Sequence, residues 1–239
     1  MTVRWENITA VFGGSFDPPH LGHREGVLGL FQNPGVGRVV ILPAGKAPQK
    51  NARLSAEQRL ELVKLGLGAE RPFPFSAEDP SLWERVSIST LELERARTHP
   101  GEAQYSYDSL LALQSGEREV GMVIGIDQLR NLPHWSRFPD VLRVAHWIVL
   151  ERKPDSLLSA EAVLRDWEAS GLLRRHTDRE WWIQGSPIGY GGARMLRVCP
   201  TPARNLSSSE IREAIVKHGV PPSATLHPQV EAELKRRLF

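Results

Sequence analysis

Short apolar runs alternate with amphipathic stretches along this chain, and that alternation restricts the fold more than any other feature. The apolar runs predict strands over Ile8–Phe12, Arg38–Pro43, Val120–Ile126, His146–Leu150 and Met195–Cys199. The amphipathic stretches predict helices from about His20, after the capping residue Ser55, over Tyr107–Leu113, over Ser208–Lys217 and from Pro228 to Leu238. Strands separated by helices are typical of βαβ units. We therefore expect an α/β fold, a doubly wound parallel sheet with flanking helices, whose ligands bind beyond the carboxyl ends of the strands.

The length of 239 residues fits a single domain, because a chain of this size can bury a large core. Its apolar residues (41%) and charged residues (24%) are in the proportions of an ordinary globular protein. We expect one domain over residues 1–239. Periodicity is weak around residues 155–194, which we interpret as a helix plus an irregular excursion, and a helical segment begins at residue 207.

The charge balance argues against a polyanionic partner. Thirty basic and 28 acidic side chains leave a net charge of +2, so we expect neither a nucleic acid nor a membrane as partner. Cys199 is the only cysteine, which excludes an internal disulfide and favours a reducing compartment. We see no signal peptide and no run of about 18 apolar residues, so we expect a cytoplasmic protein. The sequence does not predict the oligomeric state.

The stretch GGSFDPPHLGH, residues 13–23, follows the first predicted strand directly. Gly13 and Gly14 allow backbone N–H groups to approach an anion closely. A helix then begins near His20, and the N-terminus of a helix attracts negative charge. His20 and His23 lie three residues apart and share one helical face, where imidazoles can donate hydrogen bonds to phosphate. We therefore interpret residues 13–23, hereafter the corner, as a phosphate-binding element.

Two simpler interpretations of the corner exist. Paired glycines and histidines are often purely structural. Two histidines at this spacing could also bind zinc, but no third ligand follows in an HExxH pattern and Cys199 is distant in sequence. We therefore expect no metal site built from protein ligands.

The corner resembles the HxGH signature of the Rossmann-like nucleotidylyltransferases, in the form found in bacterial nicotinate-nucleotide adenylyltransferases. NLSSSEIR, residues 205–212, resembles the second signature of this family, SSTxIR, with Ser209 in place of threonine. GIDQL, residues 125–129, followed by Trp135, resembles its GxDxL…W segment, and VLER, residues 149–152, resembles its strand that ends in arginine. The resemblance covers most of the chain and implies a Rossmann-like fold.

The resemblance also implies a reaction, in which a phosphate oxygen of an acceptor attacks the α-phosphorus of ATP and releases pyrophosphate. The implied catalytic residues are His20, His23 and Arg212, which would neutralise charge on the phosphates. The implied ATP-binding residues are Gly13, Gly14, Ser15, Phe16, Gly125, Asp127, Arg152, Ser208, Ser209 and Ile211. Mg²⁺ would be bound through the phosphates and water. Alternatively, Asp127 is a helix N-cap and Arg212 a solvated helix residue.

The resemblance implies a pyridine mononucleotide as acceptor, bound by Lys50, Tyr105, Ser106 and Trp135. Trp135 would stack on the pyridine ring, or else it belongs to the core. This part of the chain departs from the family pattern. Gln49 replaces the histidine of PPHK, and the SYTxxTL element reads QYSYDSL, residues 104–110, in which Ser106 and Ser109 replace threonines. Nicotinate mononucleotide is the implied acceptor, and nicotinamide mononucleotide and phosphopantetheine are the alternatives.

Other functions fit the sequence less well. The chain has no GxxxxGK[ST] for a Walker-type enzyme and no GxGxxG for a nicotinamide-dependent dehydrogenase. A class I aminoacyl-tRNA synthetase would need a KMSKS-like loop. Pantetheine-phosphate adenylyltransferases are shorter and lack the GxDxL…W segment. A non-catalytic nucleotide sensor on the same fold remains as an alternative. Such a sensor would have little need for both the histidine pair and the SSSEIR stretch, residues 207–212.

Overall fold

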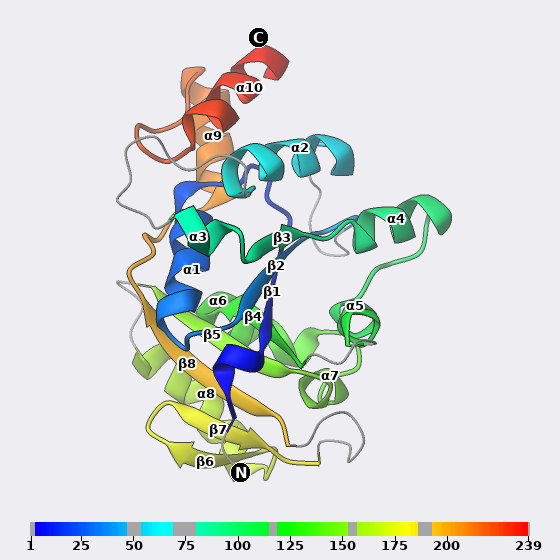
Figure 1. Ribbon diagram of the computed structural model, residues 1–239, viewed down its shortest axis with the longest axis vertical. Coiled ribbons are helices and arrows are strands. Elements are labelled where there is room, and N and C mark those ends of the chain that lie inside the picture. Colours follow the sequence, from blue (N-terminus) through cyan, green and yellow to red (C-terminus); the bar gives the residue numbers. More distant parts are fainter. Residues whose placement is uncertain are drawn as a thin grey trace. The chain divides into compact units, whose positions relative to one another are not determined.

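The computed structural model describes residues 3–46, 54–68, 80–114, 119–152, 157–185 and 193–238 (Figure 1). The chain divides into two compact units, and each is assembled from three segments. The first unit contains residues 1–12, 30–38 and 105–201, and the second contains residues 13–29, 39–104 and 202–239. A single domain over residues 1–239 stays a prediction.

The first unit is built on a sheet whose central strands are parallel. The neighbouring pairs are β1 (Thr9–Gly14) with β4 (Val120–Gly125), β4 with β5 (His146–Arg152), and β5 with β8 (Met195–Thr201). Met122 of β4 lies opposite Trp147 of β5, and both side chains are buried. Parallel strands covered on both faces consist of almost continuous apolar runs. For this reason the sequence alone predicted all four strands to within two residues of each end.

Two antiparallel strands, β7 (Glu180–Ile183) and β6 (Leu173–Thr177), extend this sheet beyond β8. The sequence analysis expected a helix and an irregular excursion here. The described residues form the expected helix, α8 (Leu157–Ala169), but in place of an irregular excursion a β-hairpin follows, whose register shifts between Arg175 and Thr177. Strand β6 was missed because only Leu173 is buried, so the strand contains no apolar run. Trp181 is fully buried on β7, and its indole N–H donates to Glu168 at 2.7 Å.

The remaining elements of the first unit are short. They are η1 (Trp5–Asn7), α5 (Ser106–Leu113), α6 (Ile126–Asn131), η2 (Leu132–His134) and α7 (Asp140–Arg143). Strand β4 passes directly into α6, with Gly125 as the N-cap. The strand predicted over Val120–Ile126 therefore ends one residue earlier than expected.

The second unit combines a parallel strand pair with helices. Its elements are β2 (Arg38–Pro43) paired with β3 (Val86–Ile88), α1 (Leu21–Gln32, of which residues up to 29 belong here), α2 (Ala56–Leu67), α3 (Pro80–Trp83), α4 (Leu91–Thr98), α9 (Ser208–His218) and α10 (Pro228–Leu238). The predicted capping box is present at the start of α2. Gln58 N–H donates to Ser55 Oγ, and Ser55 N–H donates to the Gln58 side chain at 2.8 Å.

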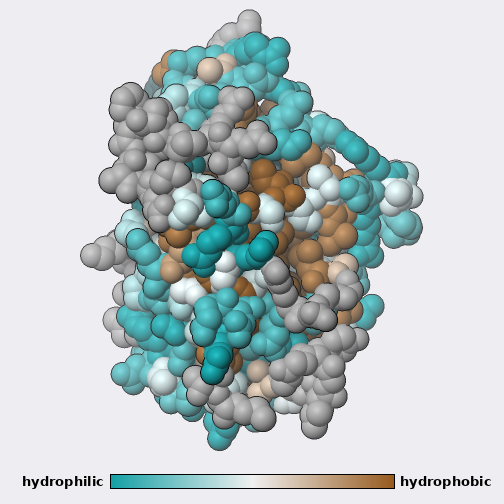
Figure 2. Space-filling view, viewed as in Figure 1, coloured by the Kyte–Doolittle hydropathy of each residue, from teal (hydrophilic) through white to brown (hydrophobic). Residues whose placement is uncertain are grey.

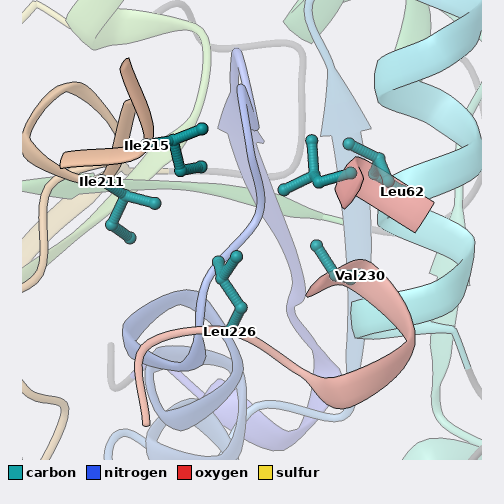
Figure 3. Close-up of a cluster of buried hydrophobic side chains, with 6 residues drawn as sticks. Leu62, Ile211, Ile215, Leu226 and Val230 are labelled. Atoms are coloured by element: carbon teal, nitrogen blue, oxygen red, sulfur yellow. The ribbon is translucent and has the colours of Figure 1, made fainter. Parts of the chain in front are cut away.

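A buried apolar cluster joins the late helices of the second unit to α2 (Figure 3). Its members are Leu62 of α2, Ile211 and Ile215 of α9, Leu226, and Val230 and Leu234 of α10. Removing this apolar surface from water fixes α9, which carries the second motif, against α2. Figure 2 shows mostly hydrophilic side chains over α10, as expected for a helix with one buried face.

The predicted α/β class with a Rossmann-like, mostly parallel sheet and flanking helices is confirmed. Strand β2 and helix α10 have the bounds that the sequence predicted. Among the described residues, no helix is long and apolar enough to cross a lipid bilayer.

Candidate active site

The corner begins where β1 ends at Gly14 and finishes in the first turn of α1. Phe16 lies between these elements with a φ of 48°, in the left-handed region that non-glycine residues rarely adopt. Its buried ring packs edge-on against the His23 ring, with the ring centroids 5.0 Å apart. A Cβ at Gly14 would lie 3.1 Å from the Phe16 ring. Glycine therefore leaves room for the ring of Phe16, which folds back over this position.

His20 and His23 form a stacked pair, with centroids 3.6 Å apart and an interplanar angle of 20°. The backbone N–H of His20 donates to His23 Nδ1 at 3.1 Å, and the backbone N–H of His23 donates to His20 Nδ1 at 3.3 Å. A neutral imidazole that accepts a hydrogen bond at Nδ1 carries its proton on Nε2. Both rings are thereby fixed as Nε2–H donors, the state in which a neutral histidine binds an anionic oxygen.

The second motif is hydrogen-bonded to the backbone of the corner. Helix α9 is capped by Ser207, whose side chain accepts from the Glu210 N–H. The next residue, Ser208, donates through its hydroxyl to the Pro18 carbonyl at 2.9 Å. Arg212, one turn later, donates through Nη1 to the Asp17 carbonyl. The N-terminus of α9 and its arginine thus lie against the turn that leads into His20.

Two neighbours of Arg212 hold its guanidinium in place. Nη2 donates to Ser209 Oγ at 3.0 Å, and Nη1 lies 3.7 Å from the Asp17 carboxylate. Ile211, from the same turn, is buried in the apolar cluster and anchors the helix. Arg212 is therefore a positioned side chain, in contrast to the alternative that it is only a solvated helix residue.

Arg204, which the sequence analysis did not identify, links the segment before the second motif to helix α1. Its backbone N–H and Nε donate to the two carboxylate oxygens of Glu25 in α1, each at 2.7 Å, and Nη1 donates to the Ala224 carbonyl at 2.9 Å. A Cβ at Gly22 would lie only 2.8 Å from the Arg204 carbonyl oxygen. The glycine of HLGH is thus required by the close approach of the segment that precedes the second motif.

Arg59 of α2 is a second residue that the sequence analysis missed. It is 2% exposed, and its guanidinium donates to the carbonyls of Ser15 at 2.8 Å and Gly45 at 3.0 Å. Burial lowers its pKa, while the charge of Asp17 acts in the opposite direction. One sequence signal could have found it, because Arg59 shares the buried face of α2 with Leu62 and Val63 at helical spacing.

Three predicted nucleotide-binding residues lie in the first unit, at the carboxyl ends of β4 and β5. Gly125 caps α6, and Asp127 is exposed in the first turn of that helix. Arg152, the last residue of β5, brings Nη2 within 3.7 Å of Asp127 Oδ1. A Cβ on Gly125 would lie 2.5 Å from Asp127 Oδ1. Gly125, and not Asp127, occupies the N-cap position, so the capping alternative does not describe Asp127.

The predicted acceptor-binding residues of the first unit are partly accessible. Trp135 is half-buried, and its ring meets Trp147 edge-on with centroids 6.1 Å apart. Tyr105 is 40% exposed at the N-cap of α5, and Ser106 is the first residue of that helix. Lys50 and Gln49 lie outside the described residues.

Comparison with known proteins agrees with these observations. A family model described as Cytidylyltransferase-like matches residues 11–214. A Stenotrophomonas maltophilia protein is 32% identical over 225 residues, which cover 92% of this chain and 90% of that protein. A Neisseria meningitidis serogroup C protein is 30% identical over 217 residues, which cover 90% and 91%. Both have the name "Probable nicotinate-nucleotide adenylyltransferase".

Solved structures share the fold. The Plasmodium falciparum nicotinic acid mononucleotide adenylyltransferase complexed with NaAD matches with a TM-score of 0.68, over 97% of this chain and 96% of that chain. The same enzyme complexed with APC matches with a TM-score of 0.64. The sequence identity is 14% in both cases, so these likenesses concern the fold alone.

Proposed function

The chain belongs to the cytidylyltransferase-like family and, within it, to the nicotinate-nucleotide adenylyltransferases, and from this premise we propose that it transfers AMP from ATP to nicotinate mononucleotide. The products are deamido-NAD and pyrophosphate, so the reaction belongs to NAD biosynthesis. The names of the relatives support the acceptor, and a cytoplasmic location fits the single cysteine.

One observation carries this proposal: the second motif is hydrogen-bonded to the backbone of the corner. Ser208 binds the Pro18 carbonyl and Arg212 binds the Asp17 carbonyl. Two histidine donors, one guanidinium and one helix N-terminus are therefore gathered in a single unit of the protein. Each of these groups binds anionic oxygens, and together they suit a triphosphate.

The reaction needs little acid–base chemistry. A phosphate oxygen of the acceptor, already anionic, forms a bond to the α-phosphorus of ATP, while the bond between that phosphorus and the oxygen bridging to the β-phosphate breaks. Pyrophosphate leaves with the bonding electron pair. Catalysis then consists of positioning and of neutralising the charge that spreads over the phosphate oxygens. In our proposal His20 and His23 donate through Nε2 to these oxygens, and Arg212 and Ser209 bind the β- and γ-phosphates.

The corner fits Mg²⁺ that is carried by ATP. Within the described residues, no group of three or more His, Cys, Asp or Glu side chains could hold a metal ion. The polar groups at the corner are mostly N–H and O–H donors, which bind phosphate oxygens. The phosphates and water would therefore hold the ion, which when bound supplies further neutralisation of the triphosphate charge.

The other predicted binding residues keep the roles that the family resemblance implies. We propose that Gly125, Asp127 and Arg152 bind the nucleotide, with Asp127 at a ribose hydroxyl or at the acceptor. Trp135 would stack on the pyridine ring with the accessible part of its indole. Tyr105, Ser106 and Lys50 would contact the acceptor's polar groups.

The test is an ATP-dependent assay of pyrophosphate release with three acceptors in parallel: nicotinate mononucleotide, nicotinamide mononucleotide and phosphopantetheine. We expect turnover with nicotinate mononucleotide and formation of deamido-NAD, identified by mass spectrometry. Turnover only with phosphopantetheine would refute the pyridine acceptor. Binding of ATP without turnover on any acceptor would indicate a nucleotide sensor.

A further inference from the structure

Arg59 is a buried cation whose hydrogen bonds go to backbone carbonyls. Its Nη1 and Nη2 bind Ser15 and Gly45, and within the described residues its Nε has no hydrogen-bond partner. A buried guanidinium is costly when no carboxylate is bound directly to it. Ser15 follows β1, and Gly45 follows β2, so Arg59 ties together two loops of this unit that each follow the carboxyl end of a strand. This is the end of a parallel sheet at which ligands bind.

The Ser15 carbonyl belongs to the same peptide group as the Phe16 N–H. This peptide is trans, because the cis bonds of the described chain lie elsewhere. In a planar trans peptide the C=O and N–H bonds point in opposite directions. By holding the Ser15 oxygen, Arg59 therefore turns the Phe16 N–H to the opposite side of the loop, away from α2. The orientation of that donor is set by a residue that is distant from it in sequence.

The backbone at Phe16 requires such support. A φ of 48° costs a non-glycine residue about 1 kcal/mol or more, and it persists only where the surroundings hold it. Left-handed residues are typical of turns whose N–H groups form an anion-binding concavity. Two contacts hold this turn in place. The buried ring of Phe16 packs against the His23 ring, and the Arg59 guanidinium donates a hydrogen bond to the Ser15 carbonyl. Both contacts converge on the peptide group that precedes the histidine pair.

The charges around Arg59 point to the same role. Asp17, Glu92 and Glu57 are the carboxylates whose charge acts on it, and Asp17 also lies against Arg212. Asp17 therefore lies near two guanidinium groups, those of Arg59 and Arg212. Guanidinium groups beside an oriented N–H donor favour an anion at the corner.

We propose that Arg59 is a positioning residue that aims the Phe16 N–H at a phosphate group of ATP and adds positive charge behind it. This inference rests on the proposed function for the identity of the nucleotide. It assigns a selective role, because Arg59 should affect binding of the triphosphate and not of the pyridine mononucleotide.

The experiment uses Arg59→Lys and Arg59→Met in the full-length protein. Binding of α,β-methylene ATP is measured by calorimetry, the KM of nicotinate mononucleotide by turnover, and stability by thermal unfolding. Lysine keeps the charge but cannot bind both carbonyls in the same geometry. We expect Arg59→Lys to weaken α,β-methylene ATP binding about tenfold, and Arg59→Met more than that, while the KM of nicotinate mononucleotide stays within about twofold.

Arg194→Met is the matched control. Arg194 is equally buried but lies in the first unit, where it binds Glu119 at 3.0 Å. The Arg194→Met variant should have a lower unfolding temperature and an unchanged affinity for α,β-methylene ATP. If Arg59→Lys lowers the unfolding temperature but keeps wild-type affinity, Arg59 only stabilises the fold and the inference is wrong. If Arg59→Met does not fold, the α,β-methylene ATP affinity and unfolding temperature of Arg59→Lys test the proposal alone. Wild-type protein that binds α,β-methylene ATP but forms no deamido-NAD contradicts the proposed function and not this inference.

Discussion

Two regions of this protein are rich in arginine, but they use it differently. In the hairpin region, residues 173–201, four of the five arginines are paired with a carboxylate. The pairs are Arg175 with Glu168, Arg179 with Glu151, Arg194 with Glu119, and Arg197 with Glu180, at 2.7–3.0 Å. At the corner, Arg59 and Arg212 donate instead to the carbonyls of Ser15, Gly45 and Asp17.

The difference explains what each region can do. A cation paired with a carboxylate is neutralised, and such pairs join neighbouring strands and helices without attracting ligands. A cation bound to carbonyls orients the backbone and keeps its charge. Within residues 13–23 Asp17 is the one carboxylate, and it lies near the guanidinium groups of both Arg59 and Arg212, cations that favour a triphosphate.

Histidines of the two units differ in the same way. His146 in β5 accepts from the Met195 N–H at Nδ1, and its Nε2 lies 3.6 Å from Glu119. Both ring nitrogens of His146 therefore lie beside protein groups. His20 and His23 each accept at Nδ1 from the other's backbone N–H, and in our proposal their Nε2–H groups donate to phosphate oxygens. Three predictions can break or sharpen this comparison.

The largest effect is expected for His23→Ala, which removes one Nε2–H donor from the corner. Turnover should fall by at least about 10², the scale of one lost transition-state donor, with little change in unfolding temperature. His176→Ala is the control, since His176 is an exposed residue of β6 in the hairpin region. A fall below tenfold for His23→Ala would mean that the histidine pair is structural.

An intermediate effect is expected when the two kinds of arginine are exchanged for methionine. Arg212→Met should lower kcat/KM for ATP by about tenfold or more, because a charged donor at the triphosphate is lost. Arg197→Met in β8 should lower the unfolding temperature through the loss of its bond to Glu180, and leave kcat/KM unchanged. Steady-state kinetics and thermal unfolding of both variants test this prediction. Equal kinetic losses would show that the comparison between the regions is false.

The smallest effect is expected from pH. Burial lowers the pKa of His146 below its ordinary value of 6.5, against the influence of Glu119, and Arg194 lowers it further. Below pH 6.5 the unfolded chain therefore binds a proton that the folded chain does not, and the free energy of unfolding decreases. The loss is at most about 1.4 kcal/mol per pH unit for one group.

The pKa of Glu119 is also lowered, chiefly by the N–H of His146, so its stabilising contribution is lost only at lower pH, below 4.5. Thermal unfolding at pH 7.5 and pH 5.5 separates the two groups. The wild type should lose stability over this interval, and His146→Gln, which keeps an acceptor and a donor, should lose less. An identical loss in both proteins would show that another group titrates.

The sequence by itself determined the elements and the motifs of this protein, because both depend on neighbours along the chain. Apolar runs defined β2, β4, β5 and β8, and local caps defined α2 and α10. The pattern GGSFDPPHLGH placed two histidines on one face of a helix start, where they do stack. The roles of the predicted site residues stay predictions.

Only the tertiary structure decided how the motifs are held together. Arg59 and Ser15 are 44 residues apart, and Arg204 and Glu25 are 179 residues apart. Strand β6 is exposed along most of its length and exists because β7 pairs with it. The sequence does not specify which distant groups pair, because a hydrogen bond to a distant carbonyl requires only that the fold bring the two groups within about 3 Å.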